Sequence, residues 1–76
     1  MTDPLSGELA VQIRAEMLRQ NLTYDDLAAR AGVPISTLRA RLSAPKGMRI
    51  EHAQQLAEAL GMSTSTLIAR AERAAA

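Results

Sequence analysis

The chain has 76 residues, 47 % of them hydrophobic, and nine Lys and Arg against eight Asp and Glu give a formal net charge of +1. It contains no cysteine, which excludes disulfides and thiolate metal sites, and Tyr24 is its only aromatic residue. No uncharged apolar run approaches the ~20 residues of a membrane-spanning helix, and the amino-terminal residues lack the pattern of a signal peptide. We therefore expect one small, soluble, intracellular domain over residues 1–76 with a compact core.

The first two helices are predicted by apolar periodicity and by the residues that begin and end them. The first helix has apolar residues at every fourth position and two more beside them: Leu5, Leu9, Ile13 and Met17, with Ala10 and Leu18. The segment Asp3-Pro4 or Ser6 opens this helix, and Asn21 closes it. Thr23 and Asp26 have the spacing of a capping box and therefore begin a second helix.

Three more helices follow in the same way. Gly32 ends the second helix in a left-handed conformation, and Pro34 lies in the first turn of a third helix that carries Leu38 and Leu42. Residues 43–47 form a loop by composition. A fourth helix begins at residues 49–50, ends at Gly61 and has an apolar stripe: Ile50, Ala53, Leu56, Ala57 and Leu60. A fifth helix is capped by a serine, carries three inward residues and frays over residues 73–76: Ser63, then Leu67, Ile68 and Ala71.

The charge is distributed unevenly along the chain. Residues 35–50 contain four basic residues and no acid, whereas the segments before and after them are slightly acidic. The four basic residues are Arg39, Arg41, Lys46 and Arg49. Association with a polyanion depends on a local cluster rather than on the total charge. The third helix and its following loop therefore form either a solvated basic face or a surface for a polyanion.

Residues 24–43 have the pattern of two helices joined by a tight turn. Ala28 is small enough for a close helix crossing, Gly32 makes the turn, and Val33 and Leu38 hold the two helices together, which is the geometry of a helix-turn-helix. The run LTYDDLAARAGVPISTLRARL, followed by a loop and EHAQQLAEALGMSTSTLIARA, resembles the lambda-repressor-like (Cro/C1-type, XRE-like) helix-turn-helix family. The stretch GVPISTLRARL with LAEALGMS is similar to regulators of that family from actinobacteria and their phages. The resemblance covers roughly residues 8–72 and implies an all-α, compact five-helix bundle.

The resemblance also implies which residues contact DNA. The family reads bases from the start and outer face of the third helix, here Ile35, Ser36, Arg39 and Ala40. Arg39 is suited to bidentate recognition of guanine O6 and N7, although it could instead be solvated or contact a phosphate. Phosphate contacts are expected from the residues around this face, namely Tyr24, Thr37, Arg41, Ser43, Lys46 and Arg49. Tyr24 stands at the start of the second helix, where the family carries a phosphate-contacting residue, and its alternative role is to cover the core.

The other charged residues have structural interpretations. Arg14 and Arg19 are expected to be solvated or paired with a neighbour such as Glu16. Arg41 stands where many family members carry an apolar residue. It either lays its stem on the core and reaches a phosphate or pairs with an acid such as Glu51.

Catalysis is not expected. His52 is the only histidine, so no His/Cys metal cluster can form, and it is expected to face solvent. The glycines are isolated, so there is no phosphate-binding loop, and no nucleophile motif is present. The sequence therefore predicts no cofactor and no small-molecule ligand.

The sequence predicts a transcriptional regulator that binds specific double-stranded DNA, a phage-type or bacterial repressor that occludes promoters in the bacterial cytoplasm or nucleoid. The family usually binds inverted half-sites as a homodimer. Met62, Leu67 and Ile68 are candidate interface residues unless they belong to the core. Two alternatives stay open: an antitoxin-like or adaptor module that keeps the fold to bind protein, and a helical bundle without a ligand. The acid-free segment 35–50 favours DNA over both.

Overall fold

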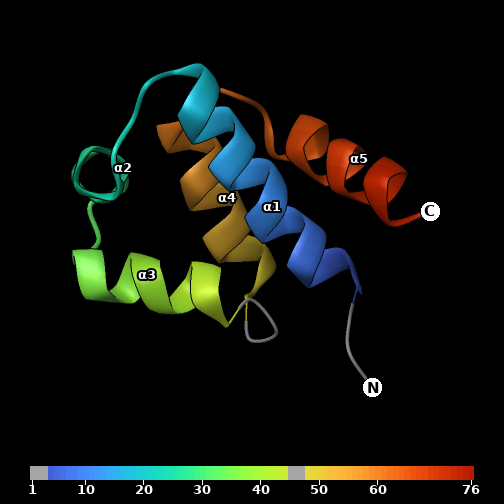
Figure 1. Cartoon of the computed structure of the whole chain (residues 1–76), viewed down its shortest axis with the longest axis horizontal. Coiled ribbons are helices and arrows are strands. Elements are labelled where there is room, and N and C mark those ends of the chain that lie inside the picture. The colour runs from blue at the N-terminus through green and yellow to red at the C-terminus, as the bar shows by residue number, and fades with distance from the viewer. Residues whose placement is uncertain (1–3, 45–47) are drawn as a thin grey trace.

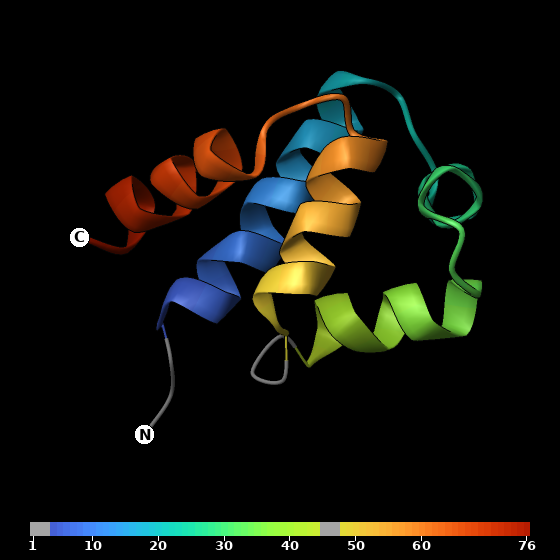
Figure 2. The same ribbon diagram turned by 180° about the vertical axis from the view of Figure 1, so that it is seen from behind.

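The computed structural model describes residues 4–44 and 48–76, and these residues form helices and no strand (Figure 1). The helices are α1 (Pro4–Arg19), α2 (Tyr24–Ala31), α3 (Ile35–Ser43), α4 (Ile50–Ala59) and α5 (Thr64–Ala75). Helices α1 and α4 lie side by side in the middle of the molecule, with α5 on one side and α2 and α3 on the other (Figures 1 and 2). The prediction of an all-α fold with five helices is confirmed.

The predicted caps of α2 and α5 are confirmed, whereas both ends of α3 differ from the prediction. Ser43, expected in the loop 43–47, is the last residue of α3, and residues 45–47 of that loop lie outside the described residues. Thr23 Oγ1 accepts from the Asp26 N–H at 3.1 Å while the Asp26 carboxylate accepts from the Thr23 N–H at 2.9 Å, so the capping box of α2 is complete. Gly32 has φ 71°, in the left-handed region, and Ser63 caps α5. Pro34 is the residue before α3 and not part of its first turn, because its ψ of 145° is extended.

Every helix contributes to a shared core. Its largest side chains with less than 2 % exposure are Ile13, Leu27, Leu38, Leu42, Leu56 and Leu67. Burying one such side chain contributes about 1.5–3 kcal/mol to folding. Two of them, Leu38 and Leu42, lie on α3 and fix that helix with one face against the core.

Some apolar residues do not lie where the stripes predict. Leu18 is 80 % exposed because it lies one position, about 100° around the helix, beyond the last inward residue of α1. Ile50 is 58 % exposed, since it is the first residue of α4 and precedes the part of that helix that enters the core. Leu67 is fully buried and therefore unavailable to a partner, while Met62 and Ile68 are half-buried and pack against the core.

Helix α5 extends to Ala75, and its last residues, 72–76, are all exposed. Fraying over residues 73–76 stays a prediction, as does the assignment of residues 1–76 to one domain.

Candidate nucleic-acid interface

The connection between α2 and α3 is a tight turn made by local backbone bonds. The N–H of Gly32 donates to the carbonyl of Ala29 at 3.3 Å, and the N–H of Val33 donates to the carbonyl of Ala28 at 3.1 Å. These bonds satisfy two of the carbonyls in the last turn of α2, and the left-handed Gly32 then redirects the chain. Figure 1 looks along the axis of α2 while α3 runs across the view, so the two helices cross steeply.

Helix α3 buries one face and presents the other to solvent. Its exposed residues are spaced three and four apart, so they share one face: Ser36, Arg39, Ala40 and Ser43. The opposite face carries the buried Leu38 and Leu42. The helix lies along the outer edge of the molecule in both views (Figures 1 and 2). Three of the four predicted base-reading residues are therefore brought together on a face that another molecule can reach.

The remaining predicted residues of α3 and its loop are less accessible or not located. Ile35 begins α3 but is half-buried and packs partly against the core, which leaves only part of its side chain for a ligand. Thr37 is also half-buried. Lys46 lies outside the described residues, so its contact with phosphate stays a prediction from the sequence.

Tyr24 joins the start of α2 to the exposed face of α3. Its ring packs against the core, and the guanidinium carbon of Arg39 lies 6.0 Å from the ring centroid. That distance allows a cation–π contact, which restricts the directions that the exposed Arg39 side chain adopts. The Tyr24 hydroxyl accepts a hydrogen bond from Nε of Arg14 at 3.3 Å. The two expected roles of Tyr24, covering the core and contacting a phosphate, are thus compatible. The ring covers part of the core, and the hydroxyl lies at the edge of the ring.

Arg14 does not have the role that its sequence neighbours suggest. It is half-buried, and its Nη2 donates to the main-chain carbonyl of Leu42 in α3 at 2.7 Å, besides the bond to Tyr24. The expectation of a solvated Arg14, or of a pair with Glu16, is therefore wrong. Nothing in the local pattern indicates this role, because Leu42 lies 28 positions further along the chain.

Arg41 is tied to α4 by a neutral partner. Its Nη1 donates to Oε1 of Gln55 at 3.2 Å, and Nε2 of Gln55 donates to the carbonyl of Ala31 at 3.0 Å. The expected pair with an acid such as Glu51 is not formed, and Arg41 bonds this amide instead. A phosphate contact by Arg41 stays a prediction.

Arg49 is exposed at the start of α4. Its main-chain N–H donates to Nδ1 of His52 at 3.2 Å, so the imidazole satisfies the N–H of the N-cap residue, as the third-position Glu or Gln does in a capping box. His52 is half-buried and takes part in this cap, which corrects the expectation that it only faces solvent. The long side chain of Arg49 remains available at the end of the basic segment.

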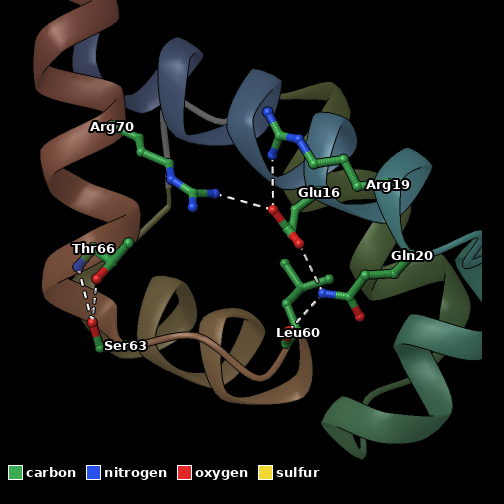
Figure 3. Close-up of polar contacts among 7 residues, drawn as sticks. All are labelled: Glu16, Arg19, Gln20, Leu60, Ser63, Thr66 and Arg70. Atoms are coloured by element: carbon green, nitrogen blue, oxygen red, sulfur yellow. Dashed lines mark hydrogen bonds and ion pairs between the residues drawn. The ribbon is translucent and has the colours of Figure 1, made fainter.

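A second polar cluster joins α1, α4 and α5 (Figure 3). The Glu16 carboxylate accepts from Gln20 at 2.9 Å, from Arg19 at 2.8 Å and from Arg70 at 3.0 Å. These contacts, with the Gln20 bond the largest cause and the Arg19 bond the next, lower the pKa of Glu16 below its ordinary value of 4.5. Gln20 also donates to the carbonyl of Leu60 at 2.7 Å and thereby ties α1 to the end of α4. The expected pair of Arg19 with Glu16 is confirmed.

The steep pair of helices, the accessible face of α3 and the basic residues beside it define the class of DNA-binding helix-turn-helix domains. The helix-turn-helix family model matches residues 13–67, and the chain belongs to this family, in its Cro/C1-type, XRE-like form. Membership makes the protein a DNA-binding regulatory domain of a family that is not typically enzymatic. The chain matches no curated protein and no solved structure.

No helix in residues 4–44 and 48–76 has the length and hydropathy to cross a bilayer. Within the same residues, no three His, Cys, Asp or Glu side chains gather closely enough to hold a metal ion.

Proposed function

We propose that this protein is a sequence-specific transcriptional regulator, a phage-type or bacterial repressor that places α3 in the major groove and occludes a promoter. The observation that carries the proposal is the solvent-exposed face of α3, on which Ser36, Arg39 and Ala40 lie together without an acid. An α-helix presented in this way enters the major groove, where each base pair shows a distinct set of donors and acceptors. The regulator would act in the bacterial cytoplasm or nucleoid, where that DNA lies.

The contacts divide into base reading and backbone positioning. Arg39 would donate two hydrogen bonds to a guanine, Ser36 would bond a base or a phosphate, and the exposed methyl of Ala40 would meet a thymine methyl. The accessible part of Ile35 would add another apolar contact. The phosphate contacts would come from Tyr24, Thr37, Arg41, Ser43, Lys46 and Arg49. One domain of this size reads few base pairs, so binding as a homodimer to inverted half-sites would supply the specificity that a genome demands.

Selection of bound sequences from a pool of random duplexes tests this proposal. The expected result is one enriched motif, with inverted symmetry if two copies bind together. The winning duplex is then compared with a shuffled duplex of the same composition by fluorescence polarisation. Equal affinity for both duplexes would overturn the proposal of sequence-specific regulation.

A second candidate is a protein-interaction module that keeps the fold, antitoxin-like or adaptor-like. The observation in its favour is apolar exposure on α1, where Val11 is 50 % and Leu18 is 80 % exposed. Leu18 also lines an open, mostly apolar groove of about 440 Å³ together with Met17 and Leu22. Failure of the random duplexes to yield a motif, with retention of the folded state, would favour this candidate.

A further inference from the structure

We infer that Arg14 is a positioning residue for DNA binding, one that holds the Tyr24 hydroxyl and the end of α3 in the geometry that the DNA meets. This inference rests on the proposed function and assigns a role to a residue outside the recognition helix. Its basis is that one half-buried guanidinium bonds both elements of the interface, Tyr24 at the start of α2 and Leu42 near the end of α3.

The bond to Tyr24 determines what its hydroxyl can do next. Nε–H of Arg14 donates to the phenolic oxygen at 3.3 Å, so the oxygen is used as an acceptor from the protein side. The hydroxyl hydrogen is then free to turn toward another acceptor, and a phenolic group can accept and donate at once. A cationic donor on the oxygen also polarises the O–H bond and strengthens the bond that it donates. Tyr24 is thereby prepared to donate to a phosphate oxygen.

The bond to Leu42 fixes the other end of the interface. Leu42 belongs to the last turn of α3, where main-chain carbonyls have no partner within the helix. Arg14 donates to this carbonyl at 2.7 Å, and its positive charge lies at the negative end of the helix dipole. Because α1 is packed into the core through Ile13 and Met17, this bond fixes the end of α3 to a rigid element.

Arginine is specifically suited to these two bonds. The planar guanidinium presents Nε–H and Nη–H in fixed directions, whereas a lysine ammonium is a point donor on a flexible stem. A lysine at this position keeps the charge but cannot hold both acceptors in the same arrangement. Geometry and charge can therefore be separated by substitution.

A double-mutant cycle on the selected duplex tests the inference. Arg14→Gln and Tyr24→Phe are each expected to weaken binding about three- to tenfold, the range of one hydrogen bond. The double variant is expected to bind about as weakly as Arg14→Gln alone, because the loss of Arg14 already removes the prepared donor of Tyr24. Arg14→Lys is expected to bind as weakly as Arg14→Gln, and the salt dependence of binding should stay the same in all variants.

The matched control is Arg19→Gln, which removes the same charge from the same helix at a side chain bonded to Glu16 at 2.8 Å. Its effect and that of Tyr24→Phe should multiply. Circular dichroism melting confirms that each variant is folded at the assay temperature, and Arg14→Lys provides the test if Arg14→Gln is not folded.

Three results would overturn the role of Arg14. These are effects of Arg14→Gln and Tyr24→Phe that multiply, full binding by Arg14→Lys, and a salt slope that flattens by about one unit in Arg14→Gln, which marks a direct phosphate contact. A wild-type chain with no preferred sequence would overturn the proposed function and this role together. A wild-type chain that selects a motif, with effects that multiply, would overturn this role alone.

Discussion

Two exposed arginines, Arg39 and Arg49, are expected to contribute to DNA binding in different ways. Arg39→Ala is expected to cost about 1–3 kcal/mol of binding free energy and to relax the preference at about one base pair, because a bidentate contact to guanine is lost. Arg49→Ala is expected to weaken all duplexes alike and to flatten the salt dependence by about one unit, since a phosphate contact carries no sequence information. Lys46→Ala should behave like Arg49→Ala.

Competition binding against duplexes changed at one position at a time distinguishes these effects. If Arg39→Ala and Arg49→Ala change the affinity for every duplex by the same factor, Arg39 contacts the backbone and not a base. Ser36 or Ala40 would then carry the base reading of α3.

Glu16 makes the stability of the folded protein depend on pH in the acidic range. Its pKa is lowered below 4.5, first by the Gln20 bond and then by Arg19. The stability that this carboxylate contributes is therefore complete above about pH 4.5 and is lost as the pH falls through its lower, folded-state pKa. Glu16→Gln is expected to reduce the free energy of unfolding by about 1 kcal/mol at pH 7 and by less at pH 3, as measured by urea denaturation.

The Glu16→Gln variant should keep a smaller acid sensitivity, because the pKa of Asp26 is also lowered, first by the hydrogen bond from the Thr23 main-chain N–H. An equal loss of stability at pH 7 and pH 3 would contradict this account. It would show that Glu16 stabilises the fold by packing rather than by its ionised contacts.

At the scale of the elements, two glycines allow a matched test of the helix-turn-helix. Gly32 has φ 71°, and a Cβ there would meet no atom within 4 Å. Gly32→Ala is therefore expected to lower the free energy of unfolding by about 1–2 kcal/mol through backbone strain alone. Gly7 lies inside α1 with equally open surroundings. Gly7→Ala should therefore raise the free energy of unfolding by about 0.5–1 kcal/mol. Thermal unfolding measures both, and a Gly32→Ala variant as stable as the wild type would show that the turn relaxes.

The elements were predictable because their boundary residues act locally. Thr23, Asp26 and Gly32 determine the ends of α2 through partners within five positions, and the sequence alone locates them correctly. The outward residues of α3 were predictable for a related reason, because Leu38 and Leu42 determine which face is buried. The partial burial of Ile35 was not predictable, because it depends on how the turn positions α3 against the core.

Contacts between distant elements could not be predicted. Arg14 bonds Leu42 at a separation of 28 positions, and Gln55 bonds Ala31 at a separation of 24. Both involve a long polar side chain that reaches a main-chain carbonyl, and every residue has such a carbonyl. No residue pattern therefore marks the partner, and only the packing of α1 and α4 against the helix-turn-helix brings the atoms together.

At the scale of the whole molecule, the near-neutral net charge conceals an uneven distribution of the charged side chains. Helix α5 lies away from α2 and α3 (Figures 1 and 2), and its Arg70 is paired with Glu16 of α1 at 3.0 Å. Arg39 and Arg49, by contrast, are exposed in the segment 35–50 that has no acid. A net charge of +1 creates little long-range attraction for DNA, so the affinity must depend on local contacts such as those expected from this segment.

This arrangement predicts a modest salt dependence that also reports the stoichiometry. With about three to five phosphate contacts in each protomer, the logarithm of the association constant should fall with the logarithm of salt concentration at a slope of about −3 to −5. Two copies on half-sites about one helical turn apart should give roughly twice that slope. Fluorescence polarisation on the selected duplex between about 50 and 200 mM salt gives the slope, and sedimentation of the complex gives the number of copies. A doubled slope with one copy in the complex would show that phosphate contacts extend well beyond residues 35–50 and would contradict a binding surface confined to α3 and its flanks.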